Sequence, residues 1–279
     1  RARRAVNGLG YRSLTCHGRV VPAAIMLSHA DERRALAAEC AEAVPATVVA
    51  GDPCWDRLLA ARPNRTAYRN ALGAGPGQRL VVVSSRWGTG SLLGRHADVL
   101  SWIANELPPS DHRIVAILHP NIWVWHGRRQ VRQWFAEPMR SGVVLLPPEE
   151  GWRAALLAGD VLIGDRGSVT AYGAALGLPV LLGPYPTGDC VPGSLFARLG
   201  EIAPRLTMDE PLLPQLAAAE RLWRGVDVSA LRDRLTSVPG RAAHTIRRTM
   251  YRLMRLPEPA GAPRIEPLPL PTPIGMAAR

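Results

Sequence analysis

Short, continuous apolar runs alternate with stretches of helical spacing through the middle of the chain. The apolar runs predict strands at 79–85, 112–119, 143–147, 160–165 and 179–183. Helical spacing between them predicts helices at 91–107, 130–142, 151–159 and 168–177. Strands that are apolar throughout are buried on both faces, which is typical of a parallel sheet between two layers of helices. The pattern therefore predicts a Rossmann-like α/β fold.

The region before this sheet contains a smaller unit. A strand at 23–29, a helix at 31–44 with Asp31 as its N-cap, and a strand at 46–51 follow a basic, irregular stretch at 1–22. This unit is too small to fold as a domain, so we expect it to be the end of a preceding α/β domain. The chain also begins without Met, and we expect it to be a piece of a longer or processed protein.

The pattern divides the chain into three parts. Residues 1–60 are expected to be the end of the first domain and a linker, and residues 61–255 the Rossmann-like domain, with further helices at 212–223, 228–237 and 241–255. The tail at 256–279 is rich in proline, which predicts an extended or disordered segment.

Polar residues follow each strand of the predicted sheet. The carboxyl ends of parallel strands lie along one edge, where α/β proteins bind their ligands. The loop after the first strand resembles a glycine-rich loop that leads into a helix N-terminus and attracts anions. Its candidate nucleotide- and phosphate-binding residues are Ser85, Arg86, Gly88 and Thr89. The alternative is a structural turn in which Ser91 caps the next helix, and the loop matches neither the Walker A pattern nor GxGxxG.

A second polar turn follows the fourth strand. Ser168 is predicted to cap the next helix, and Gly167 allows a ligand to approach the backbone closely. A diphosphate would accept hydrogen bonds from backbone N–H groups and hydroxyls here, with an arginine to neutralise its charge. The candidate residues are Asp165, Arg166, Gly167, Ser168, Val169 and Thr170.

Three residues are candidates for catalysis. His119 follows the second strand and suits a general acid or base, or a phosphate ligand; a purely structural histidine is the alternative. Glu149 and Glu150 follow the third strand and are candidates for a base or for ribose recognition. Both could equally be acids that favour the dipole of the next helix.

Composition restricts the partners. The formal net charge is +11, and all 34 basic residues are arginine, which permits anionic partners such as nucleotides, nucleic acid or a membrane surface. The arginines are dispersed and no nucleic-acid-binding signature is present, so no specific nucleic acid is expected. Trp123, Trp125, Arg128 and Arg129 form a cluster for an anionic acceptor or lipid headgroups, or else a mobile surface loop.

The cysteines and the hydropathy pattern add negative expectations. Four cysteines are scattered without a C-x-x-C pair, so no metal site, cofactor or disulfide framework is expected, and a reducing cytoplasmic setting fits. No apolar run reaches the length of a membrane-spanning helix.

The motifs resemble one protein family. His119-Pro120 and the run from Leu162 to Pro179, with Asp165 and Ser168 in an Asp-x-x-Ser motif, are similar to the C-terminal, donor-binding domain of CDP-glycerol glycerophosphotransferases. These teichoic-acid polymerase-like enzymes belong to the GT-B glycosyltransferase class. Where that family usually has a serine, this chain has Gly167. The domain-joining segment of GT-B proteins is matched by Gly51, Pro53, Asp56 and Leu58.

The resemblance implies a function. A CDP-alditol or nucleotide-sugar donor would bind with its diphosphate near Ser168, and His119 would lie near the leaving phosphate or the acceptor. The reaction would be phosphoalditol or glycosyl transfer in cell-envelope polymer synthesis, without a metal. A membrane-linked acceptor and peripheral contact with the inner face of the membrane are compatible with it. Alternatives are a UDP-sugar 2-epimerase-like enzyme and a catalytically silent nucleotide-binding or interaction protein.

Overall fold

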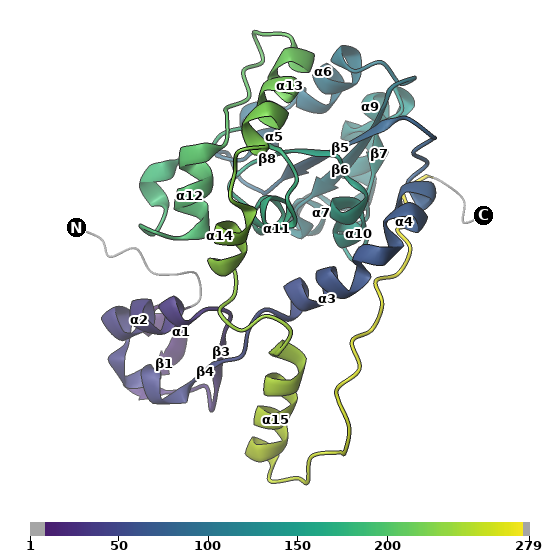
Figure 1. Ribbon diagram of the computed structural model, residues 1–279. Coiled ribbons are helices and arrows are strands. Elements are labelled where there is room, and N and C mark those ends of the chain that lie inside the picture. Colours follow the sequence, from purple (N-terminus) through teal and green to yellow (C-terminus); the bar gives the residue numbers. More distant parts are fainter. Residues whose placement is uncertain (1–8, 276–279) are drawn as a thin grey trace.

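The computed structural model describes residues 9–275 and contains an α/β body built on one parallel sheet (Figure 1). The strands lie in the order β7-β6-β5-β8-β9 and all neighbouring pairs are parallel. From β5 the chain moves outward through β6 and β7, then returns to the other side of β5 for β8 and β9. The bounds are β5 (Arg79–Ser85), β6 (His112–Leu118), β7 (Val144–Leu145), β8 (Val161–Gly164) and β9 (Val180–Leu182). The predicted α/β class and parallel sheet are confirmed.

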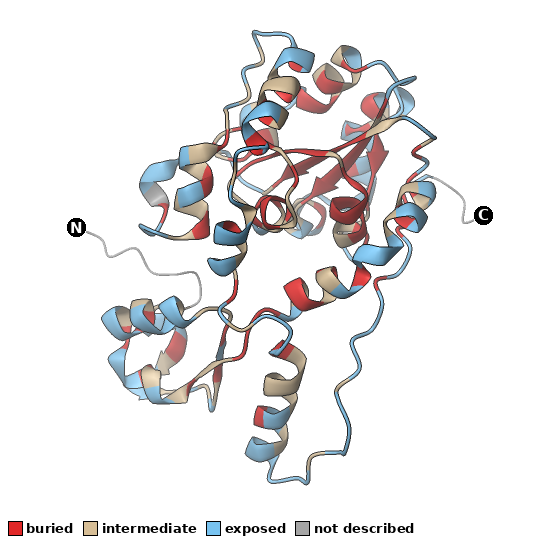
Figure 2. Cartoon of the chain, in the orientation of Figure 1, coloured by how far each residue is buried: buried red, intermediate tan, exposed pale blue. Residues whose placement is uncertain are grey.

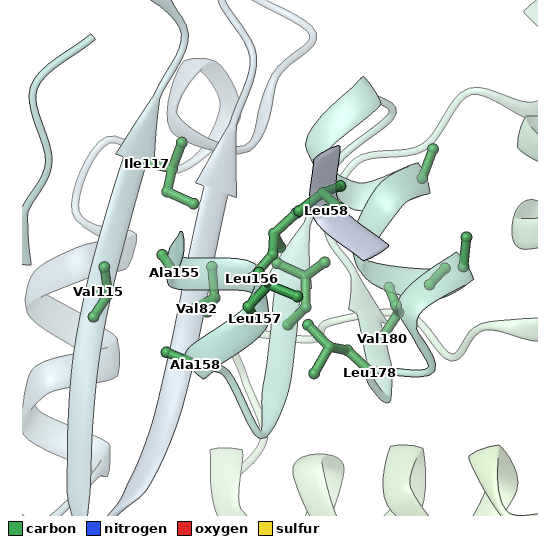
Figure 3. Packing of buried hydrophobic residues seen from close by; sticks show 14 of the residues in the cluster. Leu58, Val82, Val115, Ile117, Ala155, Leu156, Leu157, Ala158, Leu178 and Val180 are labelled. Atoms are coloured by element: carbon green, nitrogen blue, oxygen red, sulfur yellow. The ribbon is translucent and has the colours of Figure 1, made fainter. Parts of the chain in front are cut away.

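Helices cover both faces of this sheet because successive strand residues point to opposite sides. Leu80 and Val82 contribute to one core, whereas Val81 and Val83 contribute to the other. Figure 2 shows the strands buried beneath both layers, and Figure 3 shows Val82, Val115 and Leu156 packed in the first core. The first core is supplied mainly by α3 (Pro53–Ala61), α4 (Arg65–Ala71), α10 (Trp152–Ala158), α11 (Ser168–Leu176), α12 (Leu195–Ile202) and α14 (Val228–Asp233), and Trp223 joins it from a further helix.

The second face is covered by six helices of the described chain, several of which differ from the expected ones. These are α5 (Leu92–Arg95), α6 (Val99–Glu106), α7 (Pro120–His126), α8 (Arg128–Trp134), α9 (Ala136–Arg140) and α13 (Leu212–Trp223). The single helix expected at 91–107 is wrong, because the chain leaves helical geometry at His96. The helix expected at 130–142 is interrupted at Phe135, and Pro138 lies in the first turn of α9, where proline is tolerated.

The N-terminal unit pairs β3 (Ile25–Leu27) with β4 (Thr47–Val49) in parallel, through α2 (Ala30–Glu39) and the 3-10 helix η1 (Ala41–Ala46). The expected N-cap is corrected from Asp31 to His29, whose ring accepts the Asp31 N–H while Glu32 reaches back to the His29 N–H. The stretch expected to be irregular contains α1 (Tyr11–Leu14) and a hairpin of β1 (Thr15–Cys16) and β2 (Arg19–Val20). The part of that stretch at 1–8 lies outside the described residues.

The C-terminal part crosses back over the molecule (Figure 1). Helix α15 (Ala242–Met254) lies beside α3, and Asp56 of α3 accepts hydrogen bonds from the N–H groups of Gly240 and Ala242. The segment at 256–275 has no helix or strand, yet it packs against the body. Leu268 is buried and its carbonyl accepts from the Tyr68 hydroxyl, 3.3 Å away. Two 3-10 turns, η2 (Arg62–Asn64) and η3 (Thr187–Asp189), complete the fold, and no helix within 9–275 is long and apolar enough to cross a bilayer.

Candidate functional site

The strand order reverses between β5 and β8, and the loops that follow these strands diverge to opposite sides. In open α/β sheets, ligands bind at the carboxyl ends of the strands at such a point. The loop after β5 and the N-terminus of α11 after β8 therefore lie side by side at this edge of the sheet, a position that we call the crevice. His119 follows β6, the neighbour of β5 on its other side. Three of the polar turns singled out in the sequence thus lie next to one another.

Asp165 joins the two sides of this crevice. Its carboxylate accepts the Leu92 N–H at 2.8 Å and the Arg86 N–H at 3.0 Å, and the Ser85 hydroxyl lies 3.3 Å away. The residue is only 1% exposed, and burial raises the pKa of its carboxyl group. Because these contacts engage the carboxylate with the protein itself, Asp165 is placed to hold the loop after β5 in position.

The loop after β5 is a closed turn. Ser91 is the N-cap of α5: its hydroxyl accepts the Gly94 N–H at 3.0 Å and donates to the Gly88 carbonyl at 2.7 Å. Gly88 has a positive φ of 93°, which favours glycine. Its carbonyl oxygen lies so close to Gly94 that a Cβ atom on Gly94 would clash with it. The structural turn weighed above is therefore confirmed. In the part of the chain that the structure describes, the N–H groups of Gly88 and Thr89 have no protein acceptor.

Ser85 and Arg86 mark the base of this loop. Ser85 is buried, and its hydroxyl oxygen accepts the Leu93 N–H at 3.1 Å. The side chain of Arg86 is half-buried, and its Nε has no hydrogen-bond partner among the described residues. Burying a charged N–H donor without an acceptor is unfavourable, so this guanidinium is suited to pair with a bound anion.

The N-terminus of α11 is capped differently from the prediction. Gly167 is the N-cap, with extended φ and ψ of −135° and 162°, and its carbonyl accepts the Ala171 N–H. Ser168 is already the first helical residue, so the prediction that it caps the helix is wrong. Within the described residues, no side chain caps α11, and the N–H groups of Ser168, Val169 and Thr170 have no protein acceptor.

Two hydroxyls accompany these N–H groups. Ser168 is exposed, whereas Thr170 is 1% exposed, and its hydroxyl has no hydrogen-bond partner within 9–275. An uncapped helix N-terminus combines unsatisfied N–H donors with the positive end of the helix dipole. Such an arrangement binds phosphate well.

His119 is the N-cap of α7, a helix that was not expected. The ring Nδ1 accepts the Asn121 N–H at 3.1 Å. The backbone N–H of His119 donates to the Ser85 carbonyl at 3.0 Å. Burial lowers the pKa of the imidazole, so the neutral ring predominates at pH 7. Since Nδ1 is an acceptor, the proton of the neutral ring is on Nε2. His119 is therefore equipped to donate a hydrogen bond from Nε2 to a ligand.

Arg166 follows β8 and is half-buried. Its guanidinium interacts electrostatically with Tyr185, which follows β9. Burial raises the pKa of the Tyr185 phenol, and the positive charges of Arg166 and Arg205 oppose that shift. Arg166 thus adds positive charge on the β9 side of the crevice, opposite Arg86.

Glu149 and Glu150 lie on the β7 side of the sheet edge, far from the N-terminus of α11. Glu149 pairs with Arg128, and Glu150 pairs with Arg153 at 2.9 Å and with Arg57 at 3.7 Å. They follow β7, three strand positions from β8, which corresponds to about 14 Å across the sheet. The ion pairs occupy both carboxylates, so neither glutamate is a free base in this structure.

The structure also reveals aromatic contacts that the sequence pattern did not show. Trp87, in the loop after β5, stacks on Trp125 of α7 with ring centroids 6.5 Å apart. The segment at 120–126, for which a mobile loop was one interpretation, is helical. All four cysteines are free thiols, and no cluster of three or more His, Cys, Asp or Glu side chains suited to a metal occurs among the described residues.

Comparison with known proteins gives a fold relationship. No family model and no curated protein matches the sequence. The structure is similar to that of a point variant of the wall teichoic acid polymerase TagF, with a TM-score of 0.60 and 14% identity over 84% of this chain and 57% of that one. The same variant soaked with CDPG gives a TM-score of 0.58 and 16% identity over 84% and 56%. TagF itself gives 0.56 and 14% over 84% and 57%.

The chain thus spans a little over half the length of the TagF chains that it matches. Identities this low relate the folds and leave substrates and activity open. The architecture, a parallel sheet between helical layers preceded by a small unit with two parallel strands, agrees with the relationship. In fold, this protein resembles the GT-B glycosyltransferases.

Proposed function

We propose that this chain is the donor-binding part of a GT-B-type transferase that uses a nucleotide-activated donor. The observation that carries the proposal is the uncapped N-terminus of α11, which faces the loop after β5 at the reversal of strand order. Helix N-termini at this position of an α/β sheet are suited to diphosphates. The similarity in fold to TagF supports the same assignment.

The chemistry follows from the donors at the crevice. The N–H groups of Ser168, Val169 and Thr170 and the hydroxyl of Ser168 would hold the diphosphate. Arg86 and Arg166 would neutralise the charge that develops on the departing nucleotide, which is the main requirement of such a transfer. The Nε2–H of His119 would donate to the leaving phosphate or orient the acceptor. In this proposal Asp165 positions the loop and does not contact the donor.

The donor we propose is a CDP-alditol or a nucleotide sugar, used for phosphoalditol or glycosyl transfer in cell-envelope polymer synthesis. A TagF structure soaked with CDPG supports the first choice, because its fold is shared by this chain. The acceptor would be membrane-linked. Since this chain spans only part of the TagF length, the complete reaction is assigned to the full protein and not to these residues alone.

One alternative has its own support. Glu149 and Glu150 are held in ion pairs, and Gly167 lacks the hydroxyl that the resembling family usually has. A protein that binds nucleotides without catalysing transfer would show both features. It would bind the same diphosphate in the same crevice, so nucleotide binding tests the site and turnover separates the two functions.

Calorimetry with CDP, UDP, GDP and ADP tests the site directly. Ser168→Ala removes only the hydroxyl, whereas Ser168→Pro also removes one N–H while proline remains acceptable at the first position of a helix. We expect Ser168→Ala to weaken the preferred nucleotide about threefold and Ser168→Pro at least about tenfold, corresponding to the loss of one and two hydrogen bonds. The helix content should not change.

Two results would contradict the proposal. One is the failure of all four nucleotides to bind at millimolar concentration. The other is a nucleotide that binds Ser168→Pro as tightly as the parent chain, which would place the nucleotide elsewhere. Turnover of a CDP-alditol by the full protein would exclude the silent alternative.

A further inference from the structure

A second concave site lies on α8 and α9, away from the crevice. It has a volume of about 690 Å³, within the range of small-molecule sites, and is lined by Arg128, Arg129, Arg132, Gln133, Ala136, Met139 and Arg140. None of these residues belongs to the loop after β5 or to α11. We call this site the arginine groove.

The groove carries positive charge that the protein does not neutralise. All four arginines are exposed, and Arg128 alone has an ion pair, with Glu149. The side chains of Arg129, Arg132 and Arg140 have no hydrogen bond or ion pair within residues 9–275. The one acid in these two helices, Glu137, accepts a hydrogen bond from the Ser101 hydroxyl. Like charges spaced three and four residues apart on a helix destabilise it, so the cluster is unfavourable until an anion binds.

The size and lining of the groove indicate what it fits. A guanidinium binds two phosphate oxygens at once, so a single phosphate group engages about two arginines. Four arginines therefore match a ligand with at least two phosphates in series. Ala136 and Met139 add a small apolar surface to the same lining. Two exposed indoles belong to the same helical segment: Trp125 on α7 is 71% exposed and Trp134 on α8 is 50% exposed.

We infer that the arginine groove is an anion-binding site for a linear ligand carrying two or more phosphate groups. This inference does not depend on the proposed function, because it involves neither α11 nor the loop after β5. A bilayer surface fits the observations less well, because these guanidiniums line a hollow and not a projecting face. Arg128 would release Glu149, or share its guanidinium between Glu149 and the ligand.

The test uses inorganic tripolyphosphate as the probe, with orthophosphate for comparison. The protein carries Ser168→Pro, so that binding at the crevice is suppressed. Binding is followed by the fluorescence of the exposed tryptophans and by calorimetry. We expect tripolyphosphate to bind at least about tenfold more tightly than orthophosphate, because it bridges two pairs of guanidiniums.

A matched pair of variants separates the groove from the general basic charge. Arg129→Gln with Arg132→Gln removes two groove charges, and Arg221→Gln with Arg224→Gln removes two exposed charges from the region of α13. The groove pair should weaken tripolyphosphate at least about tenfold, and the control pair less than about twofold. Neither pair removes a buried side chain, so neither should lower the unfolding temperature, and the groove pair should raise it slightly because it removes like-charge repulsion on α8.

The inference is overturned if both pairs weaken tripolyphosphate equally, since binding would then reflect net charge. It is also overturned if only vesicles containing phosphatidylglycerol, or only RNA oligomers, bind while the short phosphates do not. Binding of CDP or UDP in the chain without Ser168→Pro should not respond to the groove variants. The experiments therefore distinguish a failure of the arginine-groove inference from a failure of the proposed donor site.

Discussion

The two proposed anion sites, the crevice and the arginine groove, differ in the groups that would bind the anion. In the crevice the donors are mainly backbone N–H groups, positioned by the buried carboxylate of Asp165 and by the start of α11. In the groove they are exposed side chains on two short helices. The first arrangement is fixed by folding and restricts ligand geometry, whereas the second depends on charge and tolerates variation in the ligand. Stability should therefore respond strongly to changes in the crevice and hardly at all to changes in the groove.

Asp165→Ala should have the largest effect. It leaves the N–H groups of Arg86 and Leu92 without their acceptor, at about 1–3 kcal/mol for each buried group. We expect the free energy of unfolding to fall by about 3 kcal/mol and nucleotide binding to be lost, measured by urea unfolding and calorimetry. The exposed Asp209→Ala is the control and should change little. Equal stability of the two variants would contradict the role assigned to Asp165.

The half-buried His119 in the crevice should make the stability of the protein depend on pH. Burial lowers the pKa of this imidazole in the folded state, so as pH falls below about 6.5 the unfolded chain takes up the proton first. Its stabilising contribution is present above that pH and is lost as pH falls through the folded pKa. His119→Asn keeps a side chain that can cap α7 and removes the titration.

We expect the variant to lose less stability than the parent chain between pH 7 and pH 5, because it has no imidazole to take up a proton on unfolding. Urea unfolding at several pH values measures the difference. His244→Asn, on α15, provides the comparison, because it removes a histidine that lies on a different helix from the candidate site. Parallel pH profiles for the parent chain and His119→Asn would show that His119 does not titrate as described.

Gly167→Ser should have the smallest effect. It restores the serine that the CDP-glycerol glycerophosphotransferases usually have at this position. The backbone at Gly167 is extended, and an added Cβ would meet only the Asp165 carboxylate oxygen at 3.5 Å, so serine fits. A serine N-cap adds a few tenths of a kcal/mol over glycine. We expect this gain in urea unfolding and a few-fold increase in nucleotide affinity. Weaker nucleotide binding would mean that the hydroxyl competes with the ligand for the α11 N–H groups.

The sequence predicted the sheet well because each buried strand is a distinct apolar run. The strand expected at 79–85 matches β5 residue for residue. Helix ends were predicted less well, since they depend on contacts between residues and not only on residue type. His29 and His119 act as N-caps through Nδ1, a role that the usual preference for Ser, Thr, Asp and Asn does not include.

The candidate site shows the same limit. Proximity of the loops after β5, β6 and β8 followed from parallel topology alone. The partners of each side chain could not be predicted in this way. The Asp165 carboxylate accepts backbone N–H groups, and Glu150 pairs with arginines from α3 and α10. Sequence spacing contains no information on Arg57 meeting Glu150, because that contact depends on how α3 packs over the sheet.

The returning C-terminal segment has a consequence for the order in which this protein assembles. Ile274 donates its N–H to the Leu145 carbonyl of β7, the outermost strand, and Tyr68 contacts Leu268 across a separation of 200 residues. An uncovered strand edge is a template for pairing with other chains. During synthesis, the sheet has all five strands well before the segment that shields its edge has been made. Contacts of such long range form slowly, so the nascent chain passes through an interval in which β7 is open to association.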